Sequence, residues 1–145
     1  MKTIVKHFNE LSNIELYEIL KVRCSVFVLE QTCLYPELDD KDQEAYHVFI
    51  EEDNEIKAYL RVLDKGVSFE EVSIGRVLTT QRNKGYGNII LEKGIQVAKE
   101  KFNAKAIRIE AQTYAKGYYE KFGFKQVSDE FLEDGIPHIE MLYIK

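Results

Sequence analysis

The strand-to-helix junction that decides the fold reads Thr80-Gln81-Arg82-Asn83-Lys84-Gly85-Tyr86-Gly87-Asn88. An apolar run typical of a strand precedes this junction, at residues 72–78. After it, apolar or small side chains recur at the spacing of one helix face, at Gly87, Ile90, Leu91, Gly94, Ile95, Ala98 and Phe102. The junction therefore lies between a predicted strand and the most strongly predicted helix of the chain.

This junction has the chemistry of a phosphate site. Glycines let the backbone turn its N–H groups toward a ligand, and the first turn of a helix offers unpaired donors at the positive end of its dipole. Arg82 and Lys84 add full positive charges. A bare Gly-x-Gly is more often an ordinary turn, but its place between a strand and a helix favours anion binding here.

Two known phosphate loops fit this segment poorly. The sequence contains no G-x-x-x-x-G-K-[ST] string, which excludes an NTPase of the P-loop type. A dinucleotide fingerprint would require glycine where Ile90 stands, although Glu110 follows at about the distance of a ribose-binding acid. A nicotinamide-dependent oxidoreductase is therefore the weaker alternative.

Apolar periodicity and turn signals predict the remaining elements. Ser12 and Glu15 form a capping-box pattern that begins a helix, and its periodicity ends near Glu30. The acidic residues 37–40 are expected to lie in a loop. The two strands around the long helix are expected to be parallel, because a strand-helix-strand unit crosses over in the right-handed sense. Strands are predicted at 3–8, 48–50, 56–63, 72–78, 106–111, 124–127 and 139–144, and a short helix at 113–122.

The composition excludes several classes of function. The chain has 145 residues, 45% of them hydrophobic, and is expected to form one domain over residues 1–145. Its 20 basic and 25 acidic residues give a net charge of −5, which disfavours nucleic acid and membrane surfaces as partners. Two cysteines are too few for a disulfide framework, so we expect a cytoplasmic protein with free thiols. We also expect no metal site.

Two motifs resemble the GNAT acetyltransferases. Arg82-x-x-Gly85-x-Gly87 has the R/Q-x-x-G-x-G/A form of the pyrophosphate loop in that superfamily. The segment from Gln112 to Phe124 resembles its N-x-x-A-x-x-L-Y-E-K-x-G-F motif, with glutamine in place of the usual asparagine. The strings at residues 22–31, 74–77 and 133–139 look like the ElaA-type branch, so the resemblance covers nearly the whole chain.

The resemblance implies an α/β (α+β) fold and a bound acetyl-CoA. The GNAT fold has a mixed, mostly antiparallel sheet of about six or seven strands flanked by helices, with a V-shaped splay at the cofactor site. The strand end Val77-Leu78-Thr79 would bind the pantetheine arm through its backbone, and the amides from Asn83 to Asn88 would hold the pyrophosphate. The implied cofactor-binding residues are Val77, Leu78, Thr79, Arg82, Asn83, Lys84, Gly85, Tyr86, Gly87, Asn88, Gln112 and Tyr119.

Acetyl transfer to an amine requires a proton donor for the departing thiolate and a base for the amine. The resemblance places Tyr119 at the thioester sulfur as general acid, whereas periodicity alone would make it a core aromatic. Glu110 and His138 are the candidate bases. The alternatives are that Glu110 is a solvated strand end and that His138 is a loop histidine that holds Glu133 or Asp134.

Polar residues embedded in apolar stretches form a further set of candidates. Burial of such groups costs free energy unless each finds a partner, so Arg23, Glu30 and Arg76 form either a buried network or the lining of the acceptor pocket. In the second case the acidic residues 37–40 would lie near the pocket mouth and attract a cationic amine.

The sequence therefore predicts an acetyl-CoA-dependent N-acetyltransferase acting on a small-molecule amine or a peptide amine. The alternative is a non-catalytic acyl-CoA-binding sensor with a degenerate site. The last strands are expected to pair within the chain or with a second copy, which would make a homodimer.

Overall fold

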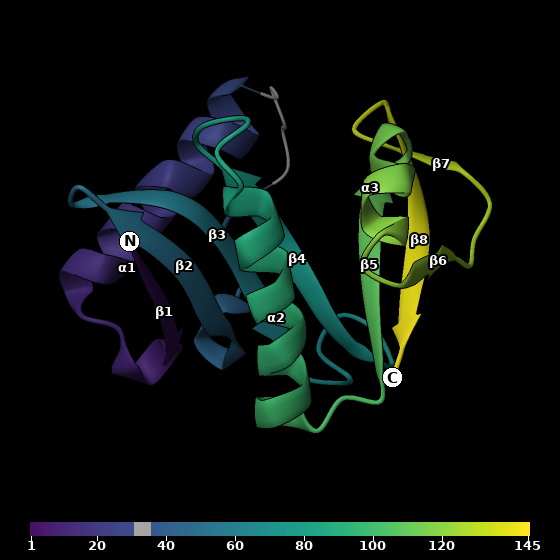
Figure 1. Ribbon diagram of the computed structural model, residues 1–145, viewed down its shortest axis with the longest axis horizontal. Coiled ribbons are helices and arrows are strands. Elements are labelled where there is room, and N and C mark those ends of the chain that lie inside the picture. The colour runs from purple at the N-terminus through teal and green to yellow at the C-terminus, as the bar shows by residue number, and fades with distance from the viewer. Residues whose placement is uncertain (31–35) are drawn as a thin grey trace.

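The computed structural model describes residues 1–30 and 36–145, which fold around one mixed sheet of eight strands (Figure 1). Seven strands follow the order β1-β2-β3-β4-β5-β8-β6, and β7 pairs with β8. The strands are β1 (Lys2–His7), β2 (Tyr46–Glu52), β3 (Glu55–Leu63), β4 (Val72–Thr79), β5 (Ala106–Gln112), β6 (Phe124–Gln126), β7 (Phe131–Glu133) and β8 (Ile136–Ile144). The helices are α1 (Asn13–Arg23), α2 (Tyr86–Phe102) and α3 (Lys116–Glu120), with a π-helical segment η2 (Cys24–Glu30) and the 3-10 turns η1 (Phe8–Glu10), η3 (Asp42–Glu44) and η4 (Thr113–Ala115).

Helix α1 begins at the predicted capping box. The Glu15 amide donates to Ser12 Oγ at 3.0 Å, and the Ser12 amide donates to Glu15 Oε1 at 2.8 Å. The helix continues into η2, so the apolar pattern that runs to Glu30 belongs to an α-helix followed by a π-helical segment.

Strands β2, β3 and β4 form the predicted antiparallel series, and β4 and β5 form the predicted parallel pair. The parallel ladder is short, because only Val72 with Ile107 and Ser73 with Arg108 are in register. Beyond these pairs β4 and β5 diverge, as Figure 1 shows. The V-shaped splay implied by the family resemblance is therefore present.

A β-bulge interrupts β4 at Arg76. Tyr59 pairs with Leu78 and Arg61 with Gly75, so two residues of β4 oppose one residue of β3. Arg76 has a φ of 54°, a left-handed conformation that side-chain-bearing residues adopt rarely. In an unbroken strand, residues four apart lie on the same face of the sheet. The bulge breaks this alternation between Ile74 and Leu78. Ile74 instead packs in the core beneath α2, whereas Leu78 packs on the opposite face against α1.

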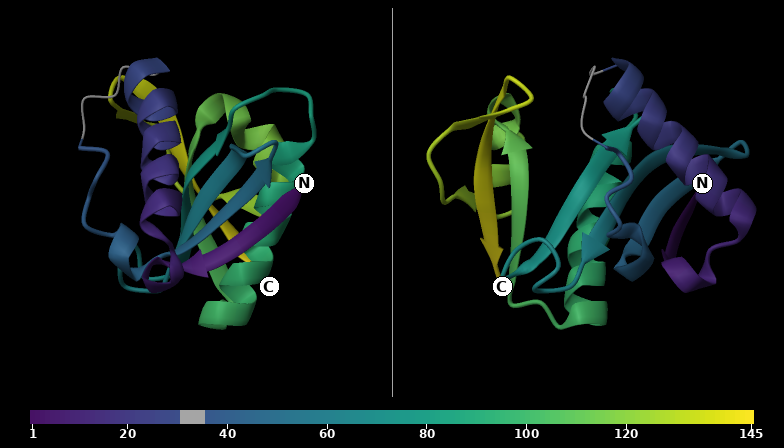
Figure 2. Two further views of the ribbon diagram at one scale, coloured as in Figure 1. Left: turned by 90° about the vertical axis from the view of Figure 1, so that its left-hand side faces the viewer. Right: turned by 180° about the vertical axis from the view of Figure 1, so that it is seen from behind.

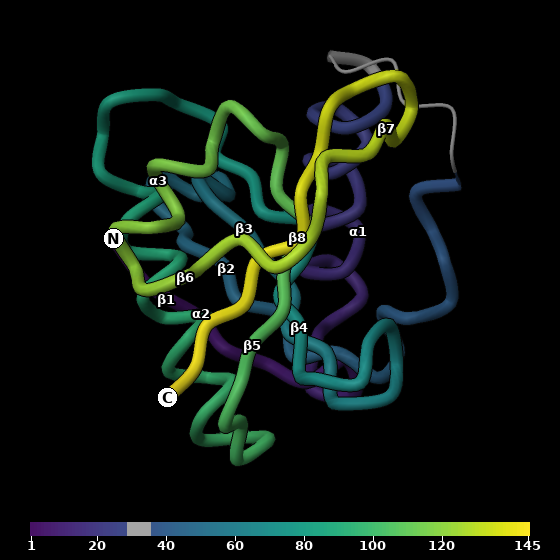
Figure 3. The backbone as a smooth tube through the Cα atoms, turned by 90° about the vertical axis from the view of Figure 1, so that its right-hand side faces the viewer, coloured from purple at the N-terminus to yellow at the C-terminus, as the bar shows by residue number. Residues whose placement is uncertain are grey.

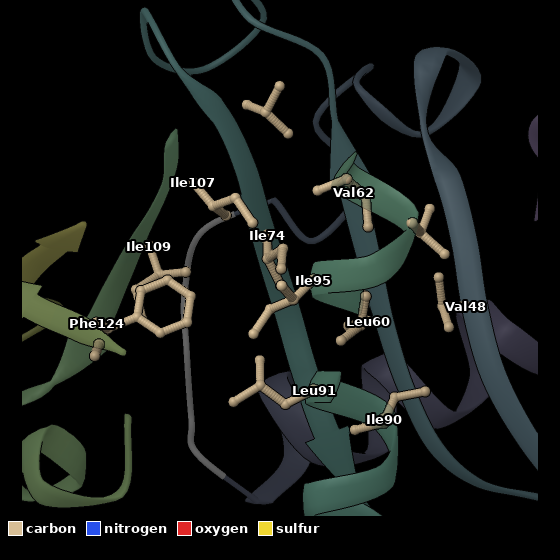
Figure 4. Close-up of a cluster of buried hydrophobic side chains, with 14 of the residues drawn as sticks. Val48, Leu60, Val62, Ile74, Ile90, Leu91, Ile95, Ile107, Ile109 and Phe124 are labelled. Carbon is tan, nitrogen blue, oxygen red and sulfur yellow. The ribbon is translucent and has the colours of Figure 1, made fainter. Parts of the chain in front are cut away.

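The sheet carries a hydrophobic core on each face. Helix α2 covers one face and α1 the other, as the two opposite views show (Figures 1 and 2). The larger core joins α2 to strands β2 to β5, with Leu60, Ile74, Ile90, Leu91 and Ile107 among its members (Figure 4). Gly94 lets α2 lie close to the sheet, since a Cβ there would be 2.7 Å from Leu60 Cδ2.

The carboxyl-terminal elements differ from the prediction, and β8 begins at Ile136 rather than at residue 139. The helix predicted at 113–122 is divided into η4 and the short α3. Strand β7 was not predicted, and it forms a hairpin with β8 through Asp134 and Gly135, whose φ values are 53° and 75°. Strand β8 pairs within the chain with β5, β6 and β7, and it runs beside β5 in Figure 3.

Candidate active site

A cavity of about 790 Å³ opens where β4 and β5 part. Its walls come from these two strands, from η4 and α3, from the β7–β8 hairpin and from residues 36–41, with further contributions from β3, η2 and residues 68–69. The cavity brings together residues that the sequence analysis selected separately, namely Arg76, Val77, Glu110, Gln112, Tyr119 and His138.

Tyr119 lies on α3 and is half-buried at the cavity wall. Its ring packs edge-to-face on Phe124 and Tyr118, with centroid distances of 5.9 and 5.5 Å. Burial, with smaller contributions from Tyr118 and Tyr114, raises the pKa of Tyr119 to about 12. The phenol therefore stays protonated at neutral pH, which a proton donor requires. Tyr119 is thus both a packed aromatic and a cavity residue.

Glu110 points into the cavity because successive side chains of β5 point to opposite faces of the sheet. Ile109 and Ala111 are buried in the core, and Glu110 lies on the opposite face of the strand. Its side chain is accessible to solvent, but the cavity walls partly desolvate the carboxyl group. This desolvation, then the hydrogen bond and the negative charge of Glu133, raise the pKa of Glu110 to about 7, with Glu140 adding to the effect and Lys41 opposing it. A carboxylate with this pKa is a stronger base than an ordinary glutamate.

His138 lies on β8, in register with Gln112 at the end of β5. Its Nδ1 atom is 2.8 Å from the Ile136 carbonyl oxygen, so Nδ1 is the donor nitrogen. In the neutral imidazole, Nε2 is then the nitrogen that accepts a proton. The ring stacks on Phe131 at a centroid distance of 6.1 Å, which holds the side chain against the hairpin.

A network of arginines and carboxylates extends from the cavity wall into the protein, and only Glu37, Asp39, Arg61 and Arg76 among its members line the cavity. Arg23 is fully buried; its Nε atom donates to Glu37 Oε2 and its Nη1 atom to Asp42 Oδ1, both at 2.7 Å. Arg61 donates from Nη1 to Asp42 Oδ1 at 2.9 Å and from Nη2 to Asp39 Oδ2 at 2.5 Å. Burial alone would raise the pKa values of Asp39 and Asp42, but the adjacent guanidinium groups hold both below their usual range.

This network corrects part of the sequence-based expectation for the acceptor pocket. Arg23 does not line the cavity, because its guanidinium is buried and paired with Glu37 and Asp42. Arg76 does line it and also pairs with Glu37, at 2.8 Å. Glu37 and Asp39 neutralise arginines, so they are not free to attract an amine. The side chain of Glu30 lies outside the part of the chain that the structure describes.

The predicted phosphate loop has a backbone suited to an anion. Asn83 and Gly85 adopt φ values of 61° and 78°, and Gly85 is the N-cap of α2 without a capping side chain. The first N–H groups of the helix are therefore left for another acceptor. Arg82 and Lys84 are exposed beside them.

Tyr118 closes one side of this loop. Its hydroxyl donates to Asn88 Oδ1 at 3.1 Å, and a Cβ added to Gly87 would be 3.0 Å from the same hydroxyl oxygen. The small residue therefore lets the Tyr118 hydroxyl lie against the first turn of α2. The uncapped amides of that turn and the charges of Arg82 and Lys84 form a donor set that fits a pyrophosphate.

The strand end beside the loop is open on one side. Thr79 pairs with Ala58 of β3, and the Thr80 amide donates to the Lys57 carbonyl at 2.9 Å. On the other side, the ladder to β5 ends at Ser73. The side chain of Leu78 is buried in the core that faces α1.

Sequence reasoning considered Glu133 only as a partner of His138, and it gave no role to Asp42 or Tyr118 in the site. Asp134-Gly135 is a strong type I′ hairpin signal and would have predicted the strand that carries Glu133. Asp42 follows the acidic loop with no local pattern that marks it as an arginine partner. Tyr118 stands where the family motif has leucine, and this departure from the motif was its signal.

Two other properties of the described residues bear on the site. No helix among them is long and apolar enough to span a membrane. Within residues 1–30 and 36–145, no three His, Cys, Asp or Glu side chains form a group suited to a metal ion. Cys24 is a free, exposed thiol, and Cys33 lies outside the described residues.

Comparison with known proteins gives consistent matches over the whole fold. The family model described as an acetyltransferase (GNAT) domain matches residues 15–145. A UPF0039 protein of Schizosaccharomyces pombe is 38% identical over an alignment that covers 97% of this chain and 95% of that protein. The crystal structure of an acyl-CoA N-acyltransferase from Pseudomonas aeruginosa matches with a TM-score of 0.93 and 35% identity over 99% of both chains. The crystal structure of Escherichia coli ElaA matches with a TM-score of 0.91 and 33% identity over 98% of both chains.

These matches agree with the geometry of the site. The diverging strands, the loop before α2 and the aromatic α3 occupy the places that the motif resemblance implied. Proteins of this fold family bind acyl-CoA. The chain belongs to the GNAT acetyltransferase family, with ElaA and UPF0039 proteins among its relatives.

Proposed function

We propose that the protein transfers the acetyl group of acetyl-CoA to an amine held in the cavity between β4 and β5. The observation that carries the proposal is that Tyr119, Glu110 and His138 line one cavity beside the open edge of β4. These side chains are one proton donor and two proton acceptors, the groups that acylation of an amine requires. Family membership supports acyl transfer as the reaction class.

Acetyl-CoA is assigned to the loop before α2 and to the open edge of β4. The amides of Tyr86, Gly87 and Asn88, with the charges of Arg82 and Lys84, would hold the pyrophosphate.

The backbone from Val77 to Thr79 would give the pantetheine arm the hydrogen bonds that an adjacent strand makes elsewhere in the sheet. Leu78 contributes only its backbone there, because its side chain is buried. Gln112, at the cavity wall, is assigned to the same arm.

The protons of the reaction can be followed from amine to thiol. When bound, acetyl-CoA supplies a thioester carbon to which the amine nitrogen forms a bond as the carbon–sulfur bond breaks. Of the two protons that an ammonium ion loses, one goes to Glu110 or His138 and then to solvent. The other ends on the sulfur, because Tyr119 donates its proton there and regains one from the nitrogen. The side chains are thereby returned to their initial state.

The general base lowers the main energetic cost of the reaction, which is deprotonation of the amine. A lysine-like amine has a pKa of about 10.4, so deprotonating it at neutral pH costs about 4.6 kcal/mol. A carboxyl group whose pKa is about 7 accepts this proton with less loss than an ordinary glutamate.

The cavity favours a cationic acceptor. Among the described lining residues are six aspartate or glutamate side chains and three lysine or arginine side chains. Both arginines are already paired with carboxylates, so the remaining acidic groups give the cavity a negative potential. A small-molecule amine or a peptide amine fits this potential better than an anionic acceptor.

The experiment measures thiol release from acetyl-CoA with polyamines, amino acids, aminoglycosides and peptides, and coenzyme A binding by calorimetry. Turnover with an amine, reduced in Tyr119→Phe, supports the proposal. Binding of coenzyme A without turnover across the panel would favour the non-catalytic sensor. Absence of coenzyme A binding would contradict both functions.

A further inference from the structure

Glu110 and Glu133 lie on two strands, β5 and β7, that both pair with β8. Glu133 is the last residue of β7, in register with Ile136 of β8, and β8 pairs along its length with β5. The turn at Asp134 and Gly135 has positive φ at both positions, which fixes the two-residue hairpin and its register. Both side chains line the cavity, Glu110 from β5 and Glu133 from the tip of the β7–β8 hairpin.

The contact between them has a chemical requirement. The carboxyl groups of Glu110 and Glu133 are hydrogen-bonded to each other. An ionised carboxylate only accepts hydrogen bonds, so this contact exists only when one of the two groups carries a proton. Two carboxylates this close repel each other when both are ionised, which favours the singly protonated pair.

We infer that Glu133 is a positioning residue for the base: it holds the Glu110 carboxyl group in the cavity and shares a single proton with it. The inference rests on the proposed acetyl transfer and selects Glu110 over His138 as the proton acceptor. In the reactive state both carboxyls are ionised. As the nitrogen–hydrogen bond of the amine breaks, an oxygen–hydrogen bond forms within the pair, whose charge changes from −2 to −1. The proton then passes to solvent, which restores the reactive state.

The charged groups around the pair are consistent with this assignment. Glu140 stands opposite Glu110 on β8, but its carboxylate is paired with Arg108 at 2.8 Å. Lys41 reduces the effect of Glu133 from across the cavity, and its Nζ atom donates to Ser68 Oγ at 2.8 Å. The other titratable or charged residues that line the cavity are Glu37, Asp39, Asp40, Arg61, Arg76, Tyr114, Tyr119, Asp134 and His138.

The kinetic test is the pH dependence of kcat with a saturating amine substrate. The wild-type kcat is expected to rise with pH, and the midpoint of this rising limb is expected near pH 7, because the pair must lose its shared proton to act as base. In Glu133→Gln the limb moves down by about one pH unit or more, since the like charge and the shared proton are lost. The KM for acetyl-CoA is unchanged, because Glu133 lies away from the cofactor loop. Glu133→Asp, which retains the carboxyl group, keeps the limb closer to the wild-type position.

Asp40→Asn is the matched control. Asp40 is an exposed carboxylate on the same cavity, and its φ of 63° is a conformation that asparagine tolerates. The substitution removes one negative charge without touching Glu110, so the limb is expected to stay in place. A limb that moves equally in Asp40→Asn and Glu133→Gln would show a general field effect and would overturn the inference.

A titration without substrate separates this inference from the proposed function. The side-chain carboxyl carbons of 13C-labelled glutamate are followed by NMR, with the Glu110 signal assigned by its loss in Glu110→Gln. We expect the wild-type signal to titrate near pH 7 and the signal in Glu133→Gln to titrate lower. A wild-type titration in the ordinary glutamate range, or one that Glu133→Gln leaves unchanged, would overturn the shared proton. A shifted titration with an unshifted kinetic limb would overturn the role of the pair in the reaction.

Discussion

The Nε atoms of Arg23 and Arg76 lie 2.7 and 2.8 Å from the same oxygen, Oε2 of Glu37. Arg23 ends α1, and Arg76 forms the bulge in β4. One carboxylate therefore ties the helix on the outer face of the sheet to the strand distortion at the edge of the cavity. Because Arg76 holds a left-handed backbone conformation, this ion pair helps to keep the bulge in place.

Glu37→Gln is expected to destabilise the fold. The substitution leaves the buried guanidinium of Arg23 with one carboxylate partner, Asp42. Breaking a buried ion pair costs about 3–5 kcal/mol, so the free energy of unfolding should fall by that order. Urea denaturation measures it, with Asp40→Asn as the exposed control. A loss as small as in the control would show that Glu37 does not stabilise the network.

The cofactor loop predicts a salt-dependent loss of coenzyme A affinity. Arg82→Ala and Lys84→Ala each remove an exposed positive charge beside the first turn of α2. Each substitution is expected to weaken binding by about 5-fold at low salt, and by less as salt screens the charges. Calorimetry at two salt concentrations measures the effect. Lys93→Ala, on the exposed face of α2 and bonded to Gln96, should change nothing.

Tyr119→Phe should lower kcat by about 10- to 1,000-fold, because the thiolate loses its proton donor. The affinity for coenzyme A should stay within about 2-fold, since the ring keeps its contacts with Tyr118 and Phe124 and loses only the hydroxyl. Steady-state kinetics and calorimetry on the same preparation separate the two effects. A variant with wild-type kcat would refute the acid assignment.

The Glu110 carboxyl group should make stability fall as pH rises. Its folded-state pKa is about 7 against an ordinary 4.5, so the folded protein retains a proton that the unfolded chain has lost. The contribution of this group to the free energy of unfolding therefore decreases between about pH 4.5 and pH 7.

Glu110→Gln removes this decrease. Relative to wild type, the variant should gain about 1 kcal/mol on going from pH 5 to pH 8, since solvent in the open cavity screens the repulsion. Urea denaturation at both pH values gives the difference. A difference between variant and wild type that is the same at both pH values would contradict the raised pKa.

Local patterns predicted much of the fold. The capping box at Ser12 and Glu15, the apolar face of α2 and the parallel pair around it are all confirmed. These features depend on residues close in sequence, where the spacing of side chains decides the structure. The bulge at Arg76 was not predictable in this way, because Glu37, the carboxylate that pairs with Arg76, is far away in the sequence.

The same distinction between local and long-range features applies to the candidate site. The loop at residues 82–88 and Tyr119 were identified from contiguous motifs, and the structure places them at the end and along the side of the diverging strands. Arg23 is buried in ion pairs with residues distant in the sequence. Only the structure could therefore decide whether it belongs to a buried network or to the pocket lining. Glu133 was not foreseen as a partner of Glu110, because the hairpin signal at Asp134-Gly135 was not used.

The most direct test of the central claim is to count products in one reaction with isotopically labelled acetyl-CoA and an active amine. Acetyl transfer predicts one labelled amide for each thiol released, measured by mass spectrometry of the amine and by thiol titration. Thiol release with labelled acetate and no labelled amide would show that the cavity delivers water, and it would contradict acetyl transfer to an amine.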